Sequence, residues 1–181
     1  MKTHVLIITG PAGVGKSTLT WEISSRLAGS GFAHAVIDTD ELDRVFPLPS
    51  LSELGTLRSG TTDVSSLTLA AIWSVYAALG HSRLIMAGVM VAPQDDRRWI
   101  MDAIPNAEII FIRLLASEKT ILSRLDKREV GSGREDQIKR SLEQAEQMRG
   151  EQDDELIMIQ TDETTPAELA DRVLRGVGWL Q

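Results

Sequence analysis

One short stretch near the start of the chain has residue types in a pattern that binds phosphate groups. The pattern is G-x-x-x-x-G-K-S, which here reads Gly10-Pro11-Ala12-Gly13-Val14-Gly15-Lys16-Ser17, with Thr18 next. Glycines let the backbone come close to phosphate oxygens, and N–H groups at the start of a following helix would point at a β-phosphate. The residues expected to hold a nucleotide are Gly10, Ala12, Gly13, Val14, Gly15, Lys16, Ser17 and Thr18.

Two side chains of this loop would interact with the charged groups of a bound nucleotide and its metal ion. Lys16 would place a positive charge beside the β- and γ-phosphates, and the Ser17 hydroxyl would be a Mg²⁺ ligand. The alternative is a glycine-rich turn with no ligand. That alternative is disfavoured because the loop lies between an expected strand and an expected helix, where phosphate-binding loops occur.

Two carboxylates follow the second expected strand. Asp38 and Asp40 are two residues apart, so on an extended chain they point to the same side, toward the cleft beyond the carboxyl ends of the strands. Asp38 would orient Mg²⁺ and its water, while Asp40 would accept the proton of an attacking hydroxyl group. The residue types leave open which of the two is the base, and also whether Asp40 only caps the short segment after it.

Arginines gather in the second half of the chain. Arg124 and Arg128 are four residues apart on an expected helix and so share one face, and Arg134 follows a Gly-Ser-Gly break. This spacing predicts a short Arg-rich lid at about 124–136, which would bring guanidinium groups to a transferred phosphoryl group and exclude water. The alternative is a solvated helix with ion pairs, since acidic residues lie close by.

The elements that must position these residues alternate along the chain. Short apolar runs predict strands at 3–9, 35–37, 83–89, 108–112 and 156–159. Apolar spacing and stop signals predict helices at 16–28, 61–79, 93–104, 117–129, 135–149 and 166–175. We therefore expect an α/β fold, a three-layer P-loop domain with a five-stranded parallel sheet.

Length and composition limit the classes of protein that remain. The 181 residues suit one domain, 1–181, and the net charge of −7 argues against broad nucleic-acid binding. The chain has no cysteine, which excludes disulfides and thiolate metal sites. It has neither an apolar run long enough to span a membrane nor a signal peptide, so we expect a cytoplasmic protein without membrane or nucleic-acid partners.

The chain resembles the small-molecule kinases of the adenylate-kinase-like P-loop group, which includes shikimate, gluconate and adenylylsulfate kinases and chloramphenicol phosphotransferase. The resemblance covers essentially the whole chain. It rests on the loop at 10–17, the carboxylates after the second strand, the arginines at 124–134, and Thr161-Asp162 before the last helix. It implies transfer of the γ-phosphoryl group of ATP, with Mg²⁺, to a hydroxyl or phosphate of a small metabolite. The residues it makes catalytic are Lys16, Asp38, Asp40 and Arg128, with Arg124 stacked on the adenine.

The resemblance also implies an acceptor-binding segment at about 41–62. Prolines and glycines at 46–60 predict that this part is a mobile surface segment. Arg44 and Arg58 flank it, and either could bind an anionic substrate, although surface solubility explains each nearly as well.

Two kinds of alternative stay open. Adenylylsulfate kinases have D-G-D-N-x-R after the second strand, whereas this chain has Asp38-Thr39-Asp40-Glu41-Leu42-Asp43-Arg44. The acceptor could therefore be adenylylsulfate, an antibiotic or a nucleoside. The chain could also be a nucleotide-binding switch with slow ATP hydrolysis, although it lacks the D-x-x-G and N-K-x-D motifs of switch GTPases. A monomer and a homodimer both fit the sequence.

Overall fold

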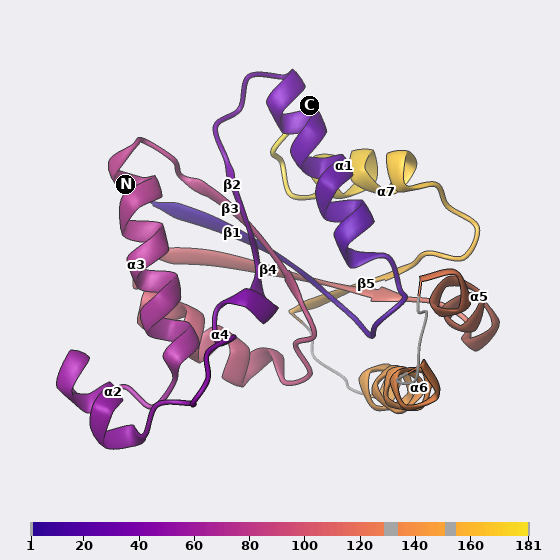
Figure 1. Ribbon diagram of the computed structural model, residues 1–181. Helices are drawn as coiled ribbons and strands as arrows, with labels where there is room; N and C mark the ends of the chain where they lie inside the picture. The colour runs from indigo at the N-terminus through magenta and orange to yellow at the C-terminus, as the bar shows by residue number, and fades with distance from the viewer. Residues whose placement is uncertain (1, 129–133, 151–154, 181) are drawn as a thin grey trace.

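The central element of the fold is one five-stranded parallel sheet (Figure 1). The computed structural model describes residues 2–128, 134–150 and 155–180, apart from the side chains at positions 127, 128 and 134. The strand order is β2-β3-β1-β4-β5. The strands are β1 (Thr3–Thr9), β2 (Ala35–Asp38), β3 (Arg83–Gly88), β4 (Ala107–Leu115) and β5 (Leu156–Gln160). The predicted number of strands and their parallel pairing are confirmed.

Helices fill the connections between the strands, and one more follows the last strand; the sequence predicts all of them except the helix at 51–57. They are α1 (Lys16–Gly29), α2 (Leu51–Leu57), α3 (Val64–Ala78), α4 (Pro93–Ala103), α5 (Glu118–Arg128), α6 (Arg134–Gly150) and α7 (Pro166–Gly176). A single 3-10 turn, η1 (Thr39–Glu41), follows β2. No helix in the described ranges is long and apolar enough to cross a membrane.

Two apolar cores lie on opposite faces of the sheet, which confirms the expected three layers. Leu6 and Ile8 of β1 are fully buried in a core that includes residues of α1, α5 and α7. Val5 and Ile7, which point to the other face, pack with residues of α3 and α4. Because every strand runs in the same direction, the carboxyl ends of β1, β2 and β3 meet at one edge of the sheet (Figure 1).

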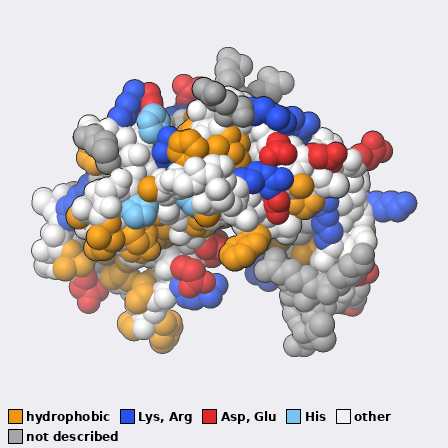
Figure 2. Space-filling model, turned by 90° about the horizontal axis from the view of Figure 1, so that it is seen from above, with side chains coloured by type: hydrophobic (Ala, Val, Ile, Leu, Met, Phe, Trp, Pro, Cys, Tyr) orange, Lys and Arg blue, Asp and Glu red, His pale blue; other side chains and the backbone are white. Residues whose placement is uncertain are grey.

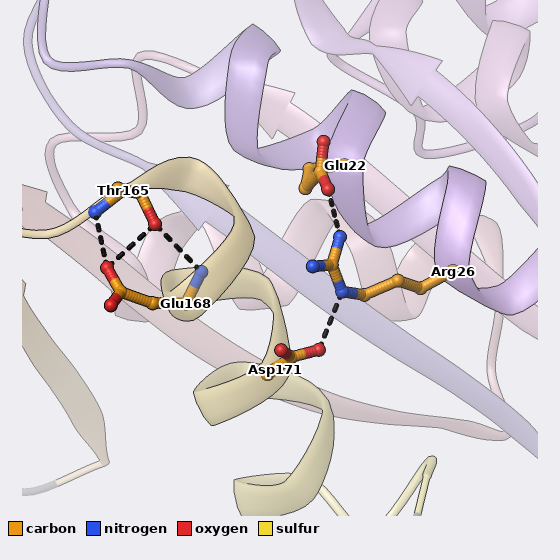
Figure 3. Close-up of polar contacts among 5 residues, drawn as sticks. All are labelled: Glu22, Arg26, Thr165, Glu168 and Asp171. Atoms are coloured by element: carbon orange, nitrogen blue, oxygen red, sulfur yellow. Dashed lines mark hydrogen bonds and ion pairs between the residues drawn. The ribbon is translucent and has the colours of Figure 1, made fainter.

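Helix α7 is fixed to α1 by one arginine. Arg26 of α1 donates from Nε to Asp171 of α7 over 2.6 Å and also forms an ion pair with Glu22 on its own helix (Figure 3). A capping box begins α7, because the Thr165 hydroxyl accepts the N–H of Glu168 and the Glu168 carboxylate accepts the N–H of Thr165 (Figure 3). The chain just before α7 is thereby held in place.

One element differs from the prediction. The segment at 46–60 was expected to lack regular structure, yet α2 lies within it. The cause is local: Ser50 and Glu53 form a capping box, in which the Ser50 hydroxyl accepts the N–H of Glu53. Gly55 lies inside this helix, and a single exposed glycine costs a helix only about 1 kcal/mol.

The face seen in Figure 2 is mixed in charge. Lys and Arg side chains alternate with Asp and Glu side chains across its described part, without a continuous basic patch. A nucleic-acid-binding face normally carries clustered positive charge.

Candidate active site

The phosphate-binding loop has a backbone that requires glycine. Gly13 has a φ of +78°, and a Cβ added to it would lie 2.9 Å from Leu125 Cγ of α5. Gly10 has a φ of +144°, and its Cβ would lie 2.7 Å from the carbonyl oxygen of Leu114. Side chains at either position would push the loop away from the elements that support it. The loop therefore sits tightly against β4 and α5.

Lys16 bends back over the loop from the first turn of α1. Its Nζ donates to the carbonyl oxygens of Gly10 at 2.8 Å and Pro11 at 3.1 Å. A lysine ammonium at a helix N-terminus is the arrangement that neutralises a phosphate. The donors of this loop thus fit the phosphates of a nucleotide.

Three distant side chains brace the loop from behind. Ser141 of α6, which is fully buried, donates to the carbonyl of Ala12 over 2.6 Å. Arg124 of α5 donates from Nη1 to the carbonyl of Val14 over 2.7 Å and to the Thr161 hydroxyl over 3.1 Å. Thr161 itself donates to Val14 over 3.3 Å. The loop is therefore positioned by elements that lie far along the chain, and Arg124 is fixed beside it.

The loop lines a cleft of 520 Å³ that also contains both predicted carboxylates. Its other walls include the end of β3 with the residue after it, parts of α6 and α7, the end of β4, and the chain around Thr161. These residues are Ala87, Gly88, Val89, Leu114, Gln137, Gln144, Thr161, Thr164, Pro166 and Leu169. Most of the predicted site residues line this cleft, and they are Ala12, Gly13, Val14, Gly15, Lys16, Ser17, Thr18, Asp38, Asp40 and Arg124. Gly10 supports the loop through its backbone, since its carbonyl accepts the Lys16 ammonium.

Asp38 and Asp40 are held at the end of β2 by a turn packed against β3. Asp38 Oδ1 accepts the N–H of Asp40 over 3.1 Å, so Asp38 caps η1. The alternative that Asp40 is the cap is wrong. The Thr39 hydroxyl donates to the carbonyl of Ala87 over 3.2 Å, and a Cβ on Gly88 would collide with that hydroxyl at 1.6 Å. Gly88 thus lets the turn approach β3, which places Asp40 on the cleft wall.

The residues present also fit a magnesium ion. Among the described residues no three or more His, Cys, Asp or Glu side chains form a metal cluster. Mg²⁺ at a phosphate site needs only one or two protein ligands, because phosphate oxygens and water supply the others. Ser17 and Asp38 both line the cleft and have the required oxygen atoms.

The two arginines expected at the acceptor do not reach the cleft. Arg44 is exposed and pairs with Glu41 at 2.9 Å. Arg58 donates from Nη2 to the carbonyl of Asp102 over 2.7 Å and pairs with its carboxylate. Neither side chain lines the cleft.

Two of the expected lid residues lie outside the described part of the chain. The side chains of Arg128 and Arg134 are not described, and the same holds for residues 129–133 between them. The lid at about 124–136 and the catalytic role of Arg128 therefore stay predictions.

Sequence reasoning missed Arg113. This residue of β4 is completely buried, and it donates from Nη2 to the carbonyls of Met90 and Val91 at 3.3 Å and from Nη1 to Met148 of α6 at 3.2 Å. Arg113 therefore links α6 to Met90 and Val91, which follow β3. The available signal was a charged residue within the otherwise apolar run from Ile109 to Leu115.

From the sequence, Asp162 was only part of the resemblance, and its structural role beside the site was not predicted. Its carboxylate accepts the N–H and hydroxyl of Ser117, the Thr120 hydroxyl and the Gln160 amide. The Ser117 and Thr120 hydroxyl bonds, with the other donors, hold the pKa of this carboxyl far below its usual range. Asp162 thus ties the start of α5 to the turn that carries Thr161.

A larger cavity of 940 Å³ lies between β5 and α7. Its walls are mainly apolar, with Ile157, Met158 and Val173 among them. Asp162, at its rim, already accepts hydrogen bonds from the chain itself. None of the phosphate-loop residues line it. The chemistry predicted from the sequence therefore belongs to the smaller cleft.

Comparison by sequence finds one family. Residues 5–154 match the model of a family described as AAA domain. No curated protein matches the sequence.

Solved structures of the same fold span nearly the whole chain. A tunicamycin resistance protein from Deinococcus radiodurans is 19% identical, with a TM-score of 0.59 over 98% of this chain and 96% of that chain. A gluconokinase from Sinorhizobium meliloti is 19% identical, with a TM-score of 0.57 over 97% and 92%. The APS kinase of Mycobacterium tuberculosis, in complex with AMPPNP and APS, is 15% identical, with a TM-score of 0.57 over 98% of both chains. These likenesses confirm the P-loop NTPase fold.

Proposed function

The chain belongs to the AAA domain family, and on that premise we propose that it is a kinase that transfers the γ-phosphoryl group of ATP to a hydroxyl group of a small acceptor. The observation that carries this proposal is that Asp38 and Asp40 line the same cleft as the phosphate-binding loop. Nucleotide binding needs only the loop, whereas transfer to a hydroxyl also needs a group that takes its proton. A phosphate acceptor would have no such need, so a hydroxyl is favoured.

The loop residues would hold the donor. Lys16 would exchange the carbonyls of Gly10 and Pro11 for oxygens of the β- and γ-phosphates. Ser17 and Asp38 would hold Mg²⁺, either directly or through water. When bound, this ion neutralises the charge that develops on the phosphates.

Asp40 would act as the base. It would take the proton of the acceptor hydroxyl while the hydroxyl oxygen bonds to the γ-phosphorus. The bond from that phosphorus to the β–γ bridging oxygen breaks, its electron pair leaves with ADP, and Asp40 passes the proton to water. Asp40 is exposed on the cleft wall, which suits a group that exchanges protons with solvent.

Arg124 would contact the nucleotide base. Its guanidinium lines the cleft and is fixed by hydrogen bonds to Val14 and Thr161. The planar guanidinium offers a face on which an aromatic ring can stack. Arg128 would reach the transferred phosphoryl group from the lid.

The neighbours in fold support ATP as the donor. Two of the three are called kinases, and the APS kinase was solved with AMPPNP, an analogue of ATP. The expected cytoplasmic location, the absence of membrane and nucleic-acid partners, and the choice between monomer and homodimer stay predictions.

Acceptor-dependent release of ADP tests this proposal. The purified chain with ATP and Mg²⁺ should release ADP slowly alone and much faster when a panel of hydroxylated small molecules includes an acceptor. The phosphorylated product should appear in the same amount as the extra ADP. ADP release that no compound accelerates would instead indicate a nucleotide-binding switch and contradict the kinase assignment.

A further inference from the structure

Helix α6 is attached to the rest of the molecule at two points near the cleft. Figure 1 shows it beside the edge of the sheet at which the parallel strands end. The fully buried Ser141 hydroxyl donates to the carbonyl of Ala12 in the phosphate-binding loop over 2.6 Å. Seven residues further along α6, the carbonyl of Met148 accepts from the buried Arg113, which also donates to Met90 just after β3. One attachment is therefore at the loop, and the other is beside the chain that follows β3.

One polar side chain of α6 lies between these two attachments and lines the cleft. Gln144 comes three residues after Ser141 and four before Met148, so the three share one face of the helix. Its side chain is half-buried and forms part of the cleft wall. Residues three apart on a helix have Cβ atoms about 5–6 Å apart. The Gln144 side chain therefore starts within one helical turn of the contact between Ser141 and the loop.

The part of the loop that α6 contacts adjoins the part that holds the Lys16 ammonium. Lys16 Nζ donates to the carbonyls of Gly10 at 2.8 Å and Pro11 at 3.1 Å, and Ser141 contacts the next residue, Ala12. On the proposed function, oxygens of the β- and γ-phosphates replace these two carbonyls at the ammonium. The γ-phosphoryl group would thus lie over the stretch of the loop that is next to α6.

The carboxylates on the cleft wall also favour this position for the γ-phosphoryl group. Asp40 lines the same cleft as Gln144, at the turn that the Thr39 hydroxyl fixes to Ala87 of β3. A phosphoryl group that leaves the loop for a hydroxyl group at Asp40 has to pass through the space between the loop and that turn. Gln144 borders this space from α6, because α6 is attached both at the loop and just after β3.

We propose that the Gln144 side-chain amide donates a hydrogen bond to an oxygen of the γ-phosphoryl group. This inference rests on the proposed kinase function. The amide has two N–H donors and no charge, so it can hold a phosphoryl oxygen without forming an ion pair with Asp38 or Asp40. A hydrogen bond to a charged oxygen is stronger than one between neutral groups. Because ADP has no γ-phosphoryl group, this contact favours the nucleotide that can donate over the one that has already reacted.

Calorimetry with two nucleotides tests the inference. AMPPNP has a γ-phosphoryl group and ADP does not, and each is titrated with Mg²⁺ into the purified chain. Gln144→Met removes both donors while it keeps the length of the side chain and a good helix former. We expect the Kd for AMPPNP to rise about tenfold, and the Kd for ADP to stay within about twofold of the wild-type value.

Gln147→Met is the matched control. Gln147 has the same side chain on the same helix, but it is exposed and is not part of the cleft wall. Both Kd values should stay within about twofold of wild type in this variant, which shows that the exchange of glutamine for methionine in α6 has no effect of its own.

A second pair of variants keeps the shape of the side chain and changes its charge. Gln144→Glu replaces the donor by a carboxylate that repels phosphate oxygens, so AMPPNP should bind more weakly than it does to Gln144→Met. Gln147→Glu places the same charge on the exposed side of α6 and should change the Kd for AMPPNP by less than about twofold. Circular dichroism checks that each variant is folded, and this pair carries the test if Gln144→Met is not.

The outcomes separate the inference from the kinase proposal. Equal AMPPNP affinity in the Gln144 variants and their Gln147 controls would overturn the inference and leave the kinase proposal intact. A parallel loss of AMPPNP and ADP affinity in the Gln144 variants would also overturn it, because Gln144 would then only support the loop. If the wild-type protein bound neither nucleotide, the kinase proposal would be contradicted, and the inference with it.

Discussion

The phosphate-binding loop and the segment at 41–57 are built in different ways. At the nucleotide end the loop at 10–17 is braced by Arg124, Ser141 and Thr161, which lie more than a hundred residues along the chain. The segment at 41–57, which belongs to the stretch predicted to bind the acceptor, is anchored through the buried side chains of Leu42 and Leu54, and much of its apolar surface is exposed.

Because of this difference, the two regions suit different kinds of ligand. A braced loop presents donors in fixed positions, which suits phosphate groups that are the same in every nucleotide. A segment with exposed apolar side chains can bury a ligand only by moving toward it, as acceptor-closing segments do. On the proposed function, phosphate recognition would be preorganised here, and acceptor recognition would depend on closure.

The largest effect is expected from the nucleotide end. Lys16→Ala should lower turnover by about 10³-fold, since it removes the positive charge beside the phosphates. ATP at about a hundred times its Kd should stabilise the wild-type protein by about 2.7 kcal/mol, and the variant should lose most of this gain at the same concentration. Thermal unfolding with and without ATP measures it. A shift in Tm equal to that of the wild type would refute the phosphate-binding role.

One methyl group added to the loop should disturb the contacts that hold it against α5. Gly13→Ala should destabilise the protein by about 1–3 kcal/mol, because its φ is positive and the new Cβ would meet Leu125. ATP affinity should fall as well, since the loop must shift. Gly29→Ala is the control, because nothing lies within 4 Å of the added Cβ. Chemical denaturation should separate the two, and equal stabilities would mean that the loop is not held by α5.

Asp162 makes part of this bracing sensitive to pH. Its folded pKa lies below the unfolded value, so its contribution is present above about pH 4 and is lost as the pH falls toward the folded pKa. Asp162→Asn should therefore cost about 1 kcal/mol at neutral pH and progressively less in acid. Exposed Asp43→Asn serves as the control. A deficit that does not change with pH would contradict the role of the Asp162 charge.

The smallest effect on stability is expected at the acceptor end. Phe46→Ser should change the free energy of unfolding by less than about 0.5 kcal/mol, because Phe46 is almost fully exposed. KM for the acceptor should nevertheless rise severalfold, since the variant removes apolar surface that closure would bury. Urea denaturation and steady-state kinetics measure the two quantities. Unchanged KM would remove this segment from the account of acceptor binding.

Local sequence signals predicted the elements but not how distant elements meet. Strands, helices and the phosphate loop follow from patterns within a few residues, and each expected strand is present. The order β2-β3-β1-β4-β5 and the role of Arg113 depend on contacts between residues far apart, which one sequence does not reveal. The helix α2 was missed although Ser50 and Glu53 form a readable capping box.

Within the candidate site, too, the sequence predicted what depends on near neighbours and missed what depends on distant residues. Asp38 and Asp40 follow a strand directly, so their position at the cleft was predictable. Arg44 and Arg58 were assigned to a substrate because they flank a segment without strong structure. In the structure each of them pairs with an acid and does not line the cleft, and the substrate-binding role stays a prediction. Glu41 is a near neighbour of Arg44, but Asp102 lies forty-four residues away from Arg58.

The most direct test of the account is a paired measurement on Asp40→Asn. Asparagine is nearly isosteric with aspartate but cannot take the hydroxyl proton. Turnover with an acceptor should fall by about 10²-fold, while the Kd for ATP, measured by calorimetry, should change by less than about twofold. If turnover stays near the wild-type value in both Asp40→Asn and Asp38→Asn, neither carboxylate serves an acceptor, and the chain is not the kinase proposed here.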